Sequence, residues 1–136
     1  MTESIPDVTS PIEILLVDDH PHVRKLLREL IETYEDLKVV GEATNGEEAV
    51  LLSATLNPAV VVMDVHLPVV SGIVATTLIK RAHPFTTIIG LTAGDPGQDA
   101  EAMTIAGAAG IIDKGAVFDA LHSTIIDAVQ RTKNLV

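Results

Sequence analysis

A short apolar run that ends in an aspartate constrains the fold of this chain most. Residues 60–63, VVVM, lead directly into Asp64, and Pro68 and Gly72 then break the run. A short run rich in β-branched residues is typical of a strand buried on both faces, as in the middle of a parallel sheet. A carboxylate at the carboxyl end of such a strand lies where open α/β sheets bind ligands. Since Asp64 could also merely cap a turn, the other strands have to decide between these interpretations.

Apolar runs and amphipathic patterns alternate along the rest of the chain. The runs predict strands over residues 12–17, 37–43, 59–63, 86–91 and 110–113. Apolar residues at helical spacing predict helices over residues 21–34, 45–56, 73–82, 98–106 and 117–133. Asn45 and Glu48 have the spacing of a capping box. The helix 98–106 contains only Met103 and Ile105 as large apolar residues, so we expect it to be loosely held.

This alternation predicts an α/β fold, a doubly wound five-stranded parallel sheet with helices on both faces. We expect the flavodoxin-like strand order 2-1-3-4-5, which places the first and third strands side by side. Hydrophobic residues make up 47% of the 136 residues, and only three of them are aromatic, which suits an aliphatic core around such a sheet. We expect one domain over residues 12–133, preceded by a polar, disordered leader over residues 1–11.

Composition excludes several classes of function. The formal net charge of −10 should repel nucleic acid and anionic membranes. The absence of cysteine excludes disulfides and thiolate metal sites and fits a cytoplasmic protein. No apolar run approaches the roughly 18 residues of a membrane helix. Residues 1–11 have neither the basic nor the apolar part of a signal peptide.

Five polar residues follow the predicted strands: Asp18, Asp19, Asp64, Thr92 and Lys114. In the expected strand order their side chains converge on one rim of the sheet. Three crowded carboxylates repel one another unless a hard cation such as Mg²⁺ neutralises them. Asp64 could then attack phosphorus to give an aspartyl phosphate, with Lys114 balancing charge and Thr92 donating to a phosphoryl oxygen. Taken singly, each residue has an ordinary interpretation as a helix cap, a solvated lysine or a hydroxyl bonded to its own backbone.

Four motifs together resemble the receiver domain of two-component response regulators over about residues 12–131. They are Val17-Asp18-Asp19-His20, Asp64-x-x-Leu67-Pro68-x-x-x-Gly72, Leu91-Thr92-Ala93, and Gly107-Ala108-Ala109-Gly110 leading to Lys114. The resemblance implies that Asp64 accepts a phosphoryl group from a sensor histidine kinase or phosphotransfer protein. It implies that Mg²⁺ binds Asp19, Asp64 and the backbone carbonyl of His66 directly, and Asp18 through water. It also assigns Thr92 to the switch and Lys114 to the phosphate. Such a domain is a signalling phosphoacceptor that catalyses only its own phosphorylation and dephosphorylation.

Two positions depart from the family pattern. Ile111 stands where receivers usually carry Tyr or Phe, and Gly115 stands where they usually carry Pro. A switch that works through an aromatic ring is therefore in doubt, and Ile111 becomes the candidate coupling residue. His66 and Gly94 flank the site and should influence how long the phosphate lasts. The resemblance also implies that the face formed by the helix 98–106, the strand 110–113 and the last helix pairs with a second copy on activation.

Other interpretations remain to be compared. A phosphohydrolase of the haloacid-dehalogenase kind needs a second Asp two residues after the nucleophile, where this chain has His66. A flavodoxin needs a phosphate loop after the first strand, where Asp18 and Asp19 would repel the phosphate. A degenerate receiver that acts only as a protein-interaction module is the remaining alternative. The segment ending in Lys114 is similar to receivers fused to a helix-turn-helix domain, but the sequence does not say whether an output domain follows Val136.

Overall fold

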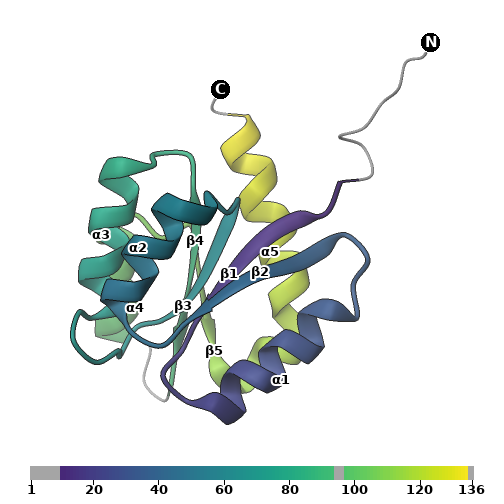
Figure 1. Ribbon diagram of the computed structural model, residues 1–136, viewed down its shortest axis with the longest axis horizontal. Coiled ribbons are helices and arrows are strands. Elements are labelled where there is room, and N and C mark those ends of the chain that lie inside the picture. Colours follow the sequence, from purple (N-terminus) through teal and green to yellow (C-terminus); the bar gives the residue numbers. More distant parts are fainter. Residues whose placement is uncertain (1–9, 94–96, 135–136) are drawn as a thin grey trace.

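The computed structural model describes residues 10–93 and 97–134 (Figure 1). Its elements run in the order β1 (Ile12–Val17), α1 (Pro21–Glu32), β2 (Leu37–Ala43), α2 (Gly46–Leu56), β3 (Val60–Asp64), α3 (Gly72–Ala82), β4 (Thr87–Thr92), α4 (Gly97–Ala106), β5 (Gly110–Asp113), the 3-10 turn η2 (Lys114–Ala116) and α5 (Val117–Lys133). The leader expected over residues 1–11 lies mostly outside the described residues, and so does Gly94. No helix in the described part of the chain is long and apolar enough to cross a membrane.

The sheet has the predicted architecture. Within the described residues it contains five strands, all parallel, in the order β2-β1-β3-β4-β5. Strands β3 and β4 each extend one residue further than predicted, so Asp64 and Thr92 are the last residues of their strands rather than the first residues of loops. Both side chains are therefore held by a strand backbone, which positions them more rigidly than a loop would.

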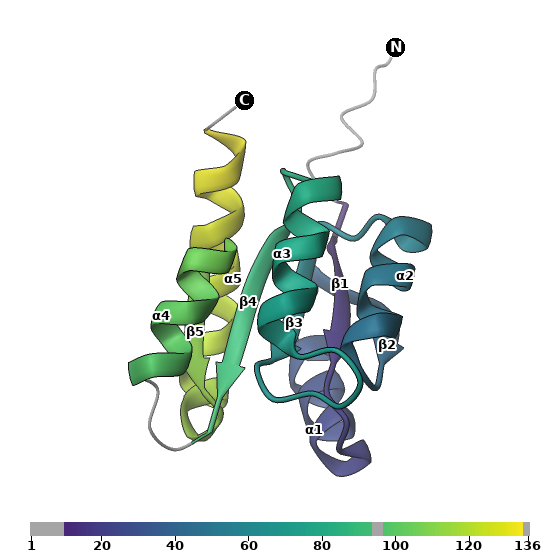
Figure 2. The same cartoon turned by 90° about the vertical axis from the view of Figure 1, so that its left-hand side faces the viewer.

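Two hydrophobic clusters hold the helices on the two faces of the sheet. Helices α1 and α5 pack on one face, around Leu27, Ile31 and Ile125, whereas α2, α3 and α4 pack on the other, around Ala49 and Ile79 (Figures 1 and 2). Every residue of β3 is buried, as expected for a central parallel strand. Burying one such aliphatic side chain stabilises the fold by about 1.5–3 kcal/mol, so the sheet is a firm base for groups at its carboxyl edge.

The cap of α2 differs from the predicted capping box by one residue. Asn45 caps the helix as expected, since its side chain accepts a hydrogen bond of 2.8 Å from the Glu48 N–H. The Glu48 carboxylate, however, accepts from the backbone N–H and the hydroxyl of Thr44, each at 2.7 Å, rather than from the Asn45 N–H. Thr44 offers two donors, its N–H and its hydroxyl, to one carboxylate oxygen of Glu48. This explains why the Glu48 carboxylate bonds to Thr44 rather than to the N-cap residue Asn45.

Helix α4 has little apolar surface packed on the sheet. Met103 is fully buried, but Ile105 is 80% exposed, so of the two large apolar residues only Met103 packs into the core. Two positions along an α-helix correspond to about 200° of rotation, so the two side chains cannot face the sheet together. Met103 is the one residue of this helix that is fully buried among those described.

Candidate functional site

Four loops and strand ends deliver the predicted site residues to the carboxyl edge of the sheet. Asp18 and Asp19 follow β1, Asp64 ends β3, Thr92 ends β4 and Lys114 opens the turn after β5. A close approach of α3 to the same edge requires glycine: a Cβ added to Gly72 would lie 2.2 Å from the carbonyl oxygen of Asp64. The order of the strands thus brings side chains that are far apart in sequence to one rim, as the sequence predicted.

The acidic residues form one compact cluster. Asp18, Asp19, His20 and Asp64 can each offer a ligand atom, and these atoms all lie within 4.8 Å of one another. The Asp18 and Asp64 residues are buried, whereas the His20 side chain is 64% exposed. Sequence reasoning gave His20 no role, although its place directly after the acidic pair was a signal. Its Nδ1 lies 3.2 Å from one oxygen each of Asp18 and Asp19.

Lys114 joins two of the carboxylates. Its Nζ lies 2.9 Å from Asp64 Oδ2, to which it donates a hydrogen bond, and 3.0 Å from Asp18 Oδ2 as an ion pair. Burial lowers the pKa of the Lys114 ammonium, but the hydrogen bond to Asp64 and the negative charges of Asp64 and Asp18 outweigh burial, so the net pKa is raised. Lys114 is therefore charged at neutral pH and holds the two acids together.

The charge of the cluster suits a further cation. Three carboxylates against one ammonium formally leave two excess negative charges. Asp18 Oδ2 and Asp19 Oδ1 are buried, and among the described residues neither accepts a hydrogen bond of good geometry, although Lys114 Nζ lies 3.0 Å from the first and His20 Nδ1 3.2 Å from the second. Buried carboxylate oxygens whose lone pairs are only partly satisfied are costly. Oxygen ligands of this kind fit a hard divalent cation such as Mg²⁺, so the residues present match the predicted metal.

Thr92 presents a second unusual polar atom. The residue is fully buried, and its hydroxyl has no hydrogen-bond partner among the described residues. The ordinary interpretation, a strand-end hydroxyl bonded to its own backbone, is therefore wrong. Buried hydroxyls without a partner are uncommon, and this one lies at the same edge of the sheet as the acidic cluster, where it could donate to a bound group.

His66 connects the site to α4. Its N–H donates to Asp64 Oδ1 at 3.1 Å, and its Nε2 lies 2.7 Å from Asp99 Oδ2 in the first turn of that helix. The sequence gave no indication of the contact with Asp99, because the contact depends on the conformation of the loop that carries His66 and on the placement of α4. The role of the His66 carbonyl as a metal ligand stays a prediction.

Ile111 lies on the same face of the sheet as α4. It is partly buried and packs against the cluster that contains Met103. Both side chains fill the space above Gly90, where an added Cβ would lie 2.8 Å from Met103 Cε and 3.1 Å from Ile111 Cδ1. Gly90 is two residues before Thr92 in β4 and pairs with Ile111 in β5. Of the predicted switch residues, Ile111 is therefore a neighbour of Met103, the residue that anchors α4.

These features define the class of protein. The family model of the response regulator receiver domain matches residues 14–126, and the chain belongs to this family. The fold, with five parallel strands in the order 2-1-3-4-5, is that of flavodoxin-like receiver structures.

Individual response regulators are similar to this chain in sequence and in structure. The chain is 38% identical to the response regulator GacA of Pseudomonas protegens over 105 residues, which cover 77% of this chain and 49% of GacA. It is 40% identical to the response regulator UvrY of Escherichia coli over 114 residues, or 84% of this chain and 52% of UvrY. The chain thus spans about half the length of these relatives. A crystal structure of a LuxR-family two-component response regulator from Aurantimonas superposes with a TM-score of 0.84 at 36% identity, covering 89% of this chain and 86% of that one.

Proposed function

We propose that this chain is the phosphoacceptor of a two-component system and that Asp64 takes a phosphoryl group from the histidine of a sensor kinase or phosphotransfer protein. One observation carries this proposal: a buried Asp64 carboxylate lies among two further carboxylates and hydrogen-bonds to Lys114. Support also comes from membership of the receiver family.

Each site residue has its own role in the phosphoryl transfer. A carboxylate oxygen of Asp64 forms the new P–O bond while the P–N bond of the donor phosphohistidine breaks, and the bond's electron pair leaves with the imidazole nitrogen. Lys114 neutralises part of the charge on the transferring group, and the free hydroxyl of Thr92 donates to one phosphoryl oxygen. Asp18, Asp19, Asp64 and the His66 carbonyl would hold Mg²⁺, which supplies further charge neutralisation when bound. Hydrolysis by water reverses the modification, so the protein acts on itself rather than on a separate substrate.

Phosphorylation changes which partner the chain binds. Thr92 moves toward the phosphoryl group, and Ile111 repacks with α4 to fill the space that it leaves. The face formed by α4, β5 and α5 then pairs with a second copy or with an output domain. A degenerate receiver that binds partners without phosphorylation is the competing function; the empty hydrogen-bonding capacity of the acidic oxygens and Thr92 favours the phosphoacceptor.

The test is labelling with a small phosphodonor. Acetyl phosphate should label the wild-type chain on Asp64 in the presence of Mg²⁺, and Asp64→Ala should take up no label. Asp19→Asn should lose most of its Mg²⁺ binding, and with it labelling at low Mg²⁺, because one of the ligands loses its charge. Asp127→Asn, at an exposed acidic position in the second half of α5, is the matched control and should behave as wild type.

Two results would contradict the proposal. Label that persists in Asp64→Ala would show that another residue accepts the phosphoryl group. A wild-type chain that binds neither Mg²⁺ nor label, while it remains folded, would favour the degenerate receiver.

A further inference from the structure

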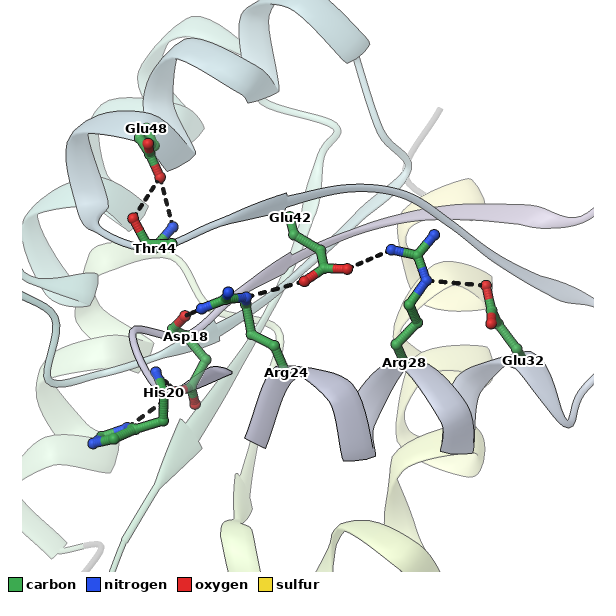
Figure 3. A network of polar contacts seen from close by, with 8 residues as sticks. All are labelled: Asp18, His20, Arg24, Arg28, Glu32, Glu42, Thr44 and Glu48. Atoms are coloured by element: carbon green, nitrogen blue, oxygen red, sulfur yellow. Dashed lines mark hydrogen bonds and ion pairs between the residues drawn. The ribbon is translucent and has the colours of Figure 1, made fainter. Parts of the chain in front are cut away.

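We propose that Arg24, held in place by Glu42, is a positioning residue that fixes the loop carrying Asp18 and Asp19 in its cation-binding geometry. Figure 3 shows the network: Arg24 Nη1 donates to the carbonyl oxygen of Asp18 at 2.8 Å, and Arg24 Nε donates to Glu42 Oε1 at 3.0 Å. This inference rests on the proposed function, because it concerns how the same acidic cluster is kept ready for Mg²⁺.

The contact matters because the loop is short. Only residues 18–20 join β1 to α1, and Asp18 is fixed at both of its backbone groups. Its N–H donates to the carbonyl of Ala43 in β2 at 3.1 Å, and its carbonyl accepts from Arg24. Because both backbone groups are held, the direction of the Asp18 Cα–Cβ bond is fixed. The backbone of Asp19, the next residue in the chain, is restrained as well.

Arg24 occupies a place that is unfavourable for a cation without partners. It lies at the amino-terminal end of α1, whose first turn contains no acidic residue, and the helix dipole disfavours positive charge there. Its side chain is only 16% exposed. Burial raises the pKa of the Glu42 carboxyl, but hydrogen bonds from Arg28 and Arg24 outweigh this effect, so the pKa is lowered. Glu42 is therefore ionised and compensates the buried guanidinium.

A β-bulge aims Glu42 at α1. The pairing of β1 with β2 shifts by one residue, since Ile14 pairs with Val39 but Leu15 pairs with Gly41. Before the shift, Val39 packs with the α1–α5 cluster; after it, Gly41 faces Leu56 of α2. Glu42, one residue later, therefore points to the α1 face. Bulges next to functional sites are used to redirect a side chain in this way.

Arg28 supplies a matched control. It lies one turn further along α1 and also donates to the Glu42 carboxylate, but its other hydrogen bond goes to Glu32 at 3.3 Å rather than to the acidic loop (Figure 3). Removing either arginine costs one positive charge and one ion pair with Glu42. Of the two arginines, Arg24 is the one that connects this ion pair to Asp18.

The experiment compares Mg²⁺ binding by wild type, Arg24→Gln, Glu42→Gln and Arg28→Gln, with thermal unfolding to verify that each variant is folded. Arg24→Gln should raise the Kd for Mg²⁺ about tenfold, the scale at which supports of metal ligands act. Glu42→Gln should raise it by a smaller factor, and Arg28→Gln should leave it within about twofold of wild type. The rate of acetyl-phosphate labelling in Arg24→Gln should fall at low Mg²⁺ and recover at saturating Mg²⁺.

A metal-free measurement separates positioning from catalysis. The His20 N–H donates to Asp18 Oδ1 at 2.9 Å, so its exchange with solvent reports the order of the loop. Its exchange should be faster in metal-free Arg24→Gln than in metal-free Arg28→Gln. Unchanged Mg²⁺ affinity and His20 exchange in folded Arg24→Gln would overturn the inference, and so would equal effects of the two arginine variants. If Arg24→Gln does not fold, Glu42→Gln decides by the same two measurements. A wild-type chain that binds no Mg²⁺ counts instead against the proposed function, and His20 exchange still tests the positioning.

Discussion

At the scale of single residues, Lys114 links two carboxylates of the site by charge. It holds two buried carboxylates at 2.9 and 3.0 Å, and its pKa is raised by them despite the opposing effect of burial. A basic group whose folded-state pKa is raised stabilises the fold fully below its unfolded pKa, about 10.4. That contribution is lost as pH rises above this value and through the higher folded-state pKa.

Measuring the free energy of unfolding as a function of pH tests this role of Lys114. The difference in unfolding free energy between wild type and Lys114→Met, measured by urea denaturation without Mg²⁺, should be largest between about pH 6 and pH 9, where carboxylates and ammonium groups are both charged, and should shrink toward pH 12. Lys25→Met, at an exposed position on α1, should show a small difference at every pH. A Lys114→Met difference that stays constant across this range would contradict the ion-pair account.

At the scale of elements, the strands and helices and most of the site could be predicted, because parallel strands place their carboxyl ends on one edge. The periodicity of the sequence therefore locates Asp18, Asp64 and Lys114 together. It does not locate the partners of Arg24, since the β-bulge that turns Glu42 toward α1 depends on the pairing of β1 with β2. The contact of His66 with Asp99 and the outward direction of Ile105 are similarly set by loop conformation and helix phase, which short-range patterns leave open.

The anchoring of α4 by few contacts leads to a prediction at this scale. Met103 and Ile111 share the space above Gly90, so shortening Ile111 should loosen the helix without touching the acidic cluster. Ile111→Ala should weaken the change in α4 amide exchange that phosphorylation causes, while the labelling rate of Asp64 stays close to wild type. At protein concentrations low enough that the chain stays monomeric, Ile105→Ala, which removes an exposed side chain from the same helix, should leave both quantities unchanged. An unaltered α4 response in Ile111→Ala would exclude this coupling route and leave the phosphoacceptor assignment intact.

At the scale of the whole molecule, net charge governs association. A chain with a formal charge of −10 repels a second copy, and salt screens this repulsion over about 8 Å at physiological ionic strength. Pairing through α4, β5 and α5 therefore has to overcome a long-range cost. The exposed Ile105 on α4 offers apolar surface for it.

We expect that beryllofluoride with Mg²⁺, a mimic of the phosphorylated state, raises self-association, and that association strengthens as NaCl increases from low to moderate concentration. Light scattering at several salt concentrations measures both effects. Ile105→Ser should remove the mimic-dependent association, because it takes apolar area from the proposed face. Leu51→Ser, the matching apolar-to-serine change at an exposed position on α2, should leave it unchanged. Association that weakens with salt would indicate attraction between opposite charges rather than apolar contact, and equal loss in both variants would assign the contact to another surface.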